Sequence, residues 1–141
     1  MEDKVIGKLE FNTGWSKFEN IKLWDKDYKL ELRFSSNIEE QPNKLQQSEY
    51  IKFKENISEI STKSKFAFDK FIEQEKEYIK QQLGESVSLR FIDLVILNEV
   101  LFFQSGKTAL LFDVEWTDEE VVLLLGNEIS IDYGEQIDGE V

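Results

Sequence analysis

The chain of 141 residues contains neither cysteine nor histidine. Without cysteine it has no disulfide framework, no thiolate nucleophile and no thiolate-bound zinc or iron–sulfur centre. Without histidine it has no imidazole base and no imidazole metal ligand. No apolar run approaches the roughly 18 residues of a membrane span, and the N-terminal stretch MEDKVIGKLEF lacks the apolar core of a signal peptide. We therefore predict a cytoplasmic protein that has no contact with a membrane.

Positive charge is missing from the last quarter of the chain. All 17 basic residues and 19 of the 29 acidic residues lie no later than Lys107, whereas residues 108–141 hold the other 10 acidic residues. Almost the whole net charge of −12 therefore belongs to this C-terminal segment. Nucleic acid is excluded as its partner, because phosphate contacts need clustered Lys and Arg. Such a segment either attracts basic proteins or cations, or only keeps the protein soluble.

The first 35 residues predict β-strands. The clearest is YKLELRF (28–34), which alternates apolar and charged side chains as a half-buried antiparallel strand does. WDKDY (24–28) predicts a hairpin turn in front of it, because Asp25 and Asp27 can accept hydrogen bonds from nearby backbone N–H groups.

The pattern changes to helical spacing after Pro42, which suits the first turn of a helix. Asn43 and Gln46, three residues apart, predict a capping box. We place a break between helices at the Ser/Thr cluster 61–64 and the end of the last helix at Gly84. The predicted apolar stripe consists of Leu45, Phe53, Ile57, Ile60, Ser64, Phe68, Phe71 and Tyr78.

Two hairpins are predicted after Gly84. One joins NEVLFFQ to TALLFDVEW through Ser105-Gly106, and the other joins VVLLL (121–125) to EISIDY through Gly126-Asn127 in a type II′ turn. VVLLL is apolar on both faces, which predicts an inner strand covered on both sides or a surface for a partner, a second copy of the chain included. Residues 86–98 fit a strand and a short helix equally well.

These segments predict a single α+β domain over residues 1–141. An antiparallel sheet would carry an N-terminal set of strands, a central block of one to three helices on one face, and the C-terminal hairpins.

Three motifs resemble reactive sites. TDEE (117–120) could hold a metal or share a proton, but consecutive side chains diverge, so we expect a charged connection between strands. DYGEQIDGEV at the C-terminus fails the calcium-loop pattern, because Gly134 stands at its third position and the chain ends before the twelfth. Gly106-Lys107-Thr108 lacks the earlier glycine of a phosphate-binding loop. We therefore predict no catalytic residue, no metal and no cofactor.

The order of motifs resembles an uncharacterised family of bacterial α+β domains. The resemblance rests on Gly14-Trp15, LWDKDYKLEL, a helix with Tyr50 and Phe53, and GKTALLFDVEW followed by acidic residues. The family motif is Trp-Asp-x-Glu-His-Gly, of which Trp116 and Glu119 match while Thr117, Glu120 and Val121 replace the other defined positions. The resemblance implies an α+β domain of no established reaction, associated with toxin–immunity loci in which acidic proteins plug a basic toxin.

Our leading hypothesis is a non-enzymatic acidic domain that binds a basic protein partner, as an immunity-type inhibitor binds its toxin. A carboxylate-based hydrolase or metal-assisted enzyme is the first alternative, and a structural module that self-associates through residues 121–125 is the second. The predicted partner-binding residues are Trp116, Asp118, Glu119, Glu120, Glu128 and Asp132.

Overall fold

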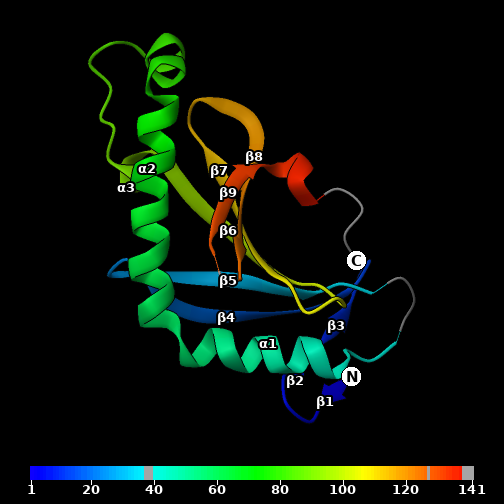
Figure 1. Cartoon of the computed structure of the whole chain (residues 1–141). Coiled ribbons are helices and arrows are strands. Elements are labelled where there is room, and N and C mark those ends of the chain that lie inside the picture. The colour runs from blue at the N-terminus through cyan, green and yellow to red at the C-terminus, as the bar shows by residue number, and fades with distance from the viewer. Residues whose placement is uncertain (37–39, 127, 138–141) are drawn as a thin grey trace.

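The computed structural model describes residues 1–36, 40–126 and 128–137. They form a seven-stranded sheet, a layer of helices on one of its faces, and a small two-stranded sheet (Figure 1). The predicted α+β architecture is thereby confirmed. The elements in chain order are β1 (Glu2–Asp3), β2 (Gly7–Lys8), β3 (Glu10–Phe11), β4 (Trp15–Leu23), β5 (Lys26–Phe34), α1 (Lys44–Glu55), α2 (Ile57–Leu83), α3 (Phe91–Leu94), β6 (Val95–Phe102), β7 (Thr108–Val114), β8 (Thr117–Leu125), β9 (Ser130–Tyr133) and the 3₁₀ turn η1 (Gly134–Ile137).

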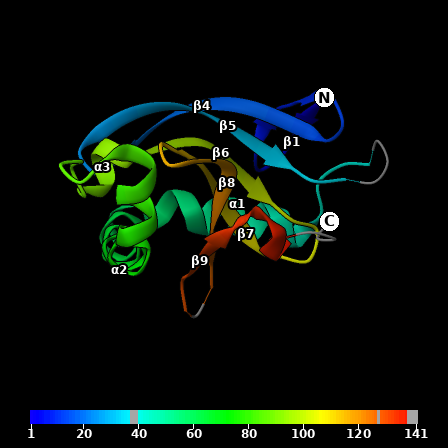
Figure 2. The same ribbon diagram turned by 90° about the horizontal axis from the view of Figure 1, so that it is seen from above.

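The large sheet has the strand order β3-β4-β5-β6-β7-β8-β9 and is antiparallel except at one junction. There β5 and β6 run parallel, from Glu31 opposite Glu99 to Phe34 opposite Phe102. The chain leaves β5, passes through the helices on one face and returns in the same direction, which is the crossover that a parallel pair requires. Figure 2 shows the sheet curving around this helical layer.

The β4–β5 hairpin confirms the predicted alternation. Leu30, Leu32 and Phe34 are buried on the helix side of the sheet. The turn lies within the predicted WDKDY stretch and consists of Trp24 and Asp25, whose φ angles are 54° and 59°. Two positive φ angles in a two-residue connection define a type I′ turn, which matches the twist of the strands.

The helices begin and end at local signals, but the break between them differs from the prediction. Asn43 caps α1 through the predicted box with Gln46, so Pro42 lies before the cap and not in the first turn. The break falls at Asn56, and the predicted break at 61–64 is wrong because α2 continues through Ser64. Gly84, with φ of 103°, ends α2 as predicted.

The sheet buries apolar side chains on both faces. The main core lies between the sheet and the helices, and a second, smaller cluster on the opposite face contains Phe103, Ala109, Leu111 and Val122. Two members of the predicted helical stripe, Leu45 and Tyr78, are instead exposed by 54% and 41%.

VVLLL (121–125) belongs to β8, an inner strand between β7 and β9. Val121, Val122 and Leu123 have no exposed surface, whereas Leu124 and Leu125 are half-buried. The connection from β8 to β9 spans more than the predicted two-residue turn, because Leu124 and Ser130 are the last paired residues. Asn127 lies outside the described residues. Residues 86–98 contain both a short helix and the start of a strand, because α3 leads directly into β6.

Candidate functional site

The acidic stretch TDEE (117–120) lies in a strand. The turn between β7 and β8 consists of Glu115 and Trp116, and β8 begins at Thr117. The prediction that these acids form the connection is therefore wrong. Thr117 pairs with Val114, after a register shift whose extra residues lie in β8 opposite Asp113.

Trp116 is buried, with 2% of its surface exposed. Its indole N–H donates to the hydroxyl of Tyr133 at 3.2 Å, and that hydroxyl donates to Oε1 of Glu75 in α2 at 3.0 Å. The ring of Phe71 packs against both aromatic rings. Trp116 thus joins the last hairpin to the helix layer and presents no surface to a partner.

The five predicted acidic residues do not all lie together. Because side chains alternate along a strand, Asp118 and Glu120 share the face of Val122, which is the sheet face away from α1 and α2. Asp132 pairs with Val122 in register and lies on the same face. Glu119 lies on the opposite face of β8, and Glu128 lies in the connection before β9.

Three further carboxylates from other strands join this face. Glu31 on β5 pairs with Glu99 on β6, and Glu99 pairs with Leu111 on β7. Asp113 lies two residues after Leu111 and is therefore on the same face of the sheet. The sequence contained part of this signal, since Glu31 and Asp113 occupy the polar phase of their alternating strands. What it lacked was the strand order, which brings β5 beside β6. We name the set the acidic face, and its members are Glu31, Glu99, Asp113, Asp118, Glu120 and Asp132.

The carboxylates of the acidic face repel one another. Burial raises the pKa of Glu99, and the charges of Glu31 and Glu120 raise it further, although the Arg33 guanidinium 3.5 Å away lowers it. Burial also raises the pKa of Glu120, together with the charge of Asp113. Ionising these carboxylates together therefore costs free energy, and a nearby positive charge would reduce this cost.

Apolar side chains border the same face. Phe18 pairs with Glu31 across β4 and β5 and is 60% exposed, and Ile96 pairs with Asp113 and is 52% exposed. Within residues 1–36, 40–126 and 128–137, no three acidic side chains gather closely enough to hold a metal ion. The acidic face thus combines dispersed charge with exposed apolar groups.

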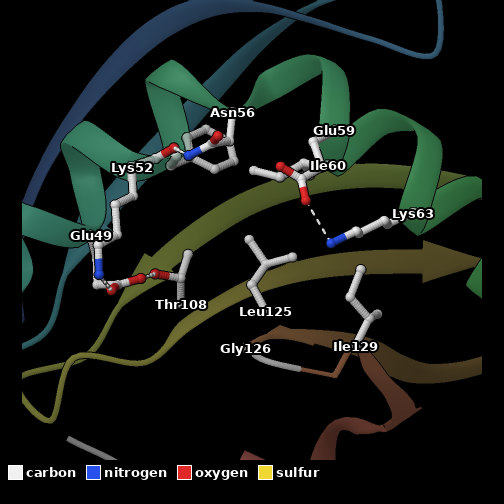
Figure 3. A pocket seen from close by; sticks show the side chains of 11 residues that line it. Glu49, Lys52, Asn56, Glu59, Ile60, Lys63, Thr108, Leu125, Gly126 and Ile129 are labelled. Carbon is white, nitrogen blue, oxygen red and sulfur yellow. Dashed lines mark hydrogen bonds and ion pairs between the residues drawn. The ribbon is translucent and has the colours of Figure 1, made fainter.

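A pocket of about 330 Å³ lies on the other side of the sheet, between the α1–α2 joint and the start of the β8–β9 connection (Figure 3). Its charged groups satisfy one another. Glu59 and Lys63 form an ion pair at 2.6 Å, Lys52 lies 3.4 Å from Glu49, and Thr108 donates to Glu49 at 3.0 Å. Because these groups are paired within the protein, the pocket offers few free contacts to a ligand.

A cluster around Glu19 also joins several ionisable groups. Tyr50 donates its hydroxyl to Glu19, and the ammonium groups of Lys17 and Lys54 lie 2.7 and 2.5 Å from that carboxylate. Burial alone would raise the pKa of Glu19, but these three donors outweigh it and lower the pKa. Burial and the neighbouring carboxylate raise the pKa of Tyr50. The cluster ties α1 to β4, so we assign it a structural role.

No family model, curated protein or solved structure matches the chain. The resemblance carried by Trp116 and Glu119 stays a prediction. Within the described residues no helix has the length and hydrophobicity needed to cross a membrane. The α+β fold and the acidic face are therefore the features that bear on its function.

Proposed function

We propose that the protein is a non-enzymatic binding domain whose acidic face receives a basic protein partner. The observation that carries the proposal is the concentration of carboxylates from five strands on one sheet face, where Lys29 and Arg33 of β5 are cations at its edge and Arg33 is ion-paired with Glu99. The raised pKa values of Glu99 and Glu120 support it, because a partner's Lys or Arg would remove the repulsion that contributes to them. Exposed Phe18 and Ile96 would supply apolar contacts beside the charged ones.

The particular form that we propose is an immunity-type inhibitor of a basic toxin, acting in the bacterial cytoplasm. The acidic face and the resemblance to the toxin-associated family support this form. Electrostatic steering would make association fast and sensitive to salt.

The test begins with capture of partners from the producing organism at low ionic strength. A captured basic protein is then purified, and its affinity for the wild type is compared with that for Asp113→Lys/Asp118→Lys/Glu120→Lys. We expect the triple variant to lose binding by at least about a hundredfold, since close charge pairs at interfaces couple by about 1.5 kcal/mol or more each. Affinity for the wild type should also fall as salt is raised.

A matched control separates the position of the charges from the net charge. The control variant carries the same change in charge at exposed positions outside the acidic face, namely Glu55→Lys, Glu77→Lys and Glu85→Lys. The proposal holds if the control retains most of the affinity. Equal losses in the two variants would mean that only net charge matters, and failure to capture any basic protein would remove the proposed function.

A carboxylate-based hydrolase is the second candidate, and the raised pKa values of Glu99 and Glu120 are the observation that favours it, because a general acid must stay protonated near neutral pH. It ranks second because the acids are spread over five strands. The hydrolase would become the leading candidate if the protein hydrolysed a substrate, if Glu120→Gln abolished this activity, and if Glu99→Gln shifted its pH profile.

A further inference from the structure

A second concave surface lies where the β4–β5 turn meets α2 and α3, away from the acidic face. Its volume is about 420 Å³, within the range of small-molecule sites. Trp24, Phe91 and Ile92 provide an apolar floor, and charged side chains from three elements surround it. The charged residues are Asp25 from the turn, Lys65 and Asp69 from α2, and Arg90 from the segment before α3.

Trp24 has an unusual backbone conformation and is held by contacts to α2 and α3. A tryptophan at φ of 54° is unusual, since this left-handed region suits Gly, Asn and Asp. Its backbone N–H donates to Ser61 at 3.3 Å, and its indole N–H donates to buried Ser64 at 2.9 Å. The ring meets Phe91 edge-on with centroids 5.2 Å apart. The type I′ turn accounts for this φ, and the contacts to Ser61, Ser64 and Phe91 hold the ring beside the cavity.

The charged groups around this floor are not paired with one another. Lys65 and Asp69 stand four residues apart on α2, the same spacing at which Glu59 and Lys63 form an ion pair at 2.6 Å on that helix. Yet among the residues that the structure describes, Lys65, Asp69 and Asp25 form no ion pair.

Arg90 is held only loosely. Its Nε lies 3.9 Å from a carboxylate oxygen of Asp93, and its side chain is 78% exposed. The rim therefore presents two cationic groups and two carboxylates that are available to a ligand, in contrast to the self-paired rim of the pocket in Figure 3.

We propose that the cavity beside Trp24 binds a small zwitterion with an apolar side group, of the amino-acid class. Lys65 and Arg90 bind its carboxylate, Asp25 and Asp69 bind its ammonium group, and the floor takes the side group. A ligand with a single charge would pair with either the two cations or the two carboxylates of the rim, but not with both. The ligand therefore needs a positive and a negative charge. The site is independent of the acidic face and of the proposed protein partner.

The test is a titration of the ¹⁵N-labelled full chain with glycine, L-leucine, L-phenylalanine and L-tryptophan, followed by NMR. The indole N–H signal of Trp24 reports on the site directly, and the backbone signals of Lys65 and Ile92 support it. We expect saturable shifts confined to this region for at least one of the apolar amino acids. 3-Phenylpropionate and phenethylamine, which each lack one charge of L-phenylalanine, should bind at least about threefold more weakly.

Two variants and one control complete the test. Lys65→Gln and Asp69→Asn should each raise the dissociation constant at least about threefold. Lys70→Gln, at an exposed lysine of the same helix that does not line this cavity, should leave it unchanged. All three side chains are exposed, so the fold should persist. The proposal is overturned if none of the four amino acids gives saturable shifts here, if a singly charged analogue binds equally well, or if the control weakens binding as much as Lys65→Gln.

Discussion

Replacing Gln46 tests how the two halves of the sheet are joined. This side chain is buried, and its amide N–H₂ donates to the carbonyl of Ser35 at 2.8 Å and to that of Phe102 at 2.9 Å. Its carbonyl accepts the backbone N–H of Asn43 at 3.0 Å, which closes the capping box of α1. One residue therefore connects the ends of β5 and β6 to the first turn of the helix between them.

Gln46→Leu should lower the free energy of unfolding by about 2–4 kcal/mol. Loss of the hydrogen bond from the Asn43 backbone N–H to the Gln46 side chain costs about 1 kcal/mol. The carbonyl of Ser35 loses its amide donor, which costs about 1–3 kcal/mol when the group is shielded from water. The carbonyl of Phe102 loses less, because it still accepts the backbone N–H of Ser35 at 3.1 Å.

Urea unfolding followed by circular dichroism measures this loss, with Asn43→Ala as the control. The control removes the cap and the contact from Asn43 to Gln104 but leaves the bridge between β5 and β6, so it should cost only about 1 kcal/mol. If Gln46→Leu costs no more than Asn43→Ala, the bridge contributes nothing and the reasoning fails.

Three further predictions concern single ionisable or hydroxyl groups. The hydroxyl of Tyr28 is buried without a partner within the described structure, so Tyr28→Phe should leave the free energy of unfolding unchanged or raise it by up to about 1 kcal/mol. The hydroxyl of Tyr133 is hydrogen-bonded to Trp116 and Glu75, so Tyr133→Phe should lower that free energy by about 1 kcal/mol. Calorimetry on both variants measures the difference. The pKa of Glu19 is lower in the folded protein than in the unfolded chain, where it is about 4.3. Ionised Glu19 therefore stabilises the fold at pH above the unfolded-state pKa, and this contribution is lost as the pH falls through the folded-state pKa. Glu19→Gln should therefore be less stable than wild type at pH 7 and show a smaller loss of stability on acidification, and an unchanged acid dependence would contradict this. The raised pKa of Glu120 has the opposite sign, so wild-type stability gains from its protonation as pH falls, and Glu120→Gln should be more stable than wild type at pH 7 in the same urea assay.

Local signals predicted the elements whose interactions are local. The alternation in residues 28–34 indicated which face of β5 is buried, because neighbouring side chains on a strand must point to opposite faces. The capping box at Asn43 and Gln46 and the ending of α2 at Gly84 involve atoms only a few residues apart. Such features can be predicted without knowing where the rest of the chain lies.

Features set by distant contacts could not be predicted in the same way. The break at 61–64 was wrong because Ser64 faces the core and accepts a hydrogen bond from Trp24, which holds that part of α2 helical against the β4–β5 turn. The acids at 118–120 were placed in a turn because their polarity is typical of a connection, whereas the pairing of Thr117 with Val114 places them in β8. The acidic face itself depends on the parallel pairing of Glu31 with Glu99, residues 68 positions apart.

The acidic face and the β5–β6 junction depend on each other. Glu31 and Glu99 oppose each other across the parallel ladder, so joining the halves of the sheet brings like charges together. At the same junction the stacked rings of Phe34 and Phe102, 4.8 Å apart, and the bridge from Gln46 offset that repulsion. A basic partner on this face would relieve the repulsion only in the folded chain, and it would therefore raise the free energy of unfolding by mass action. It follows that such a partner should restore part of the stability that Gln46→Leu removes. A zwitterion bound beside Trp24 would also stabilise the fold, but by an amount that neutralising Glu99 does not change, and this difference separates the two sites.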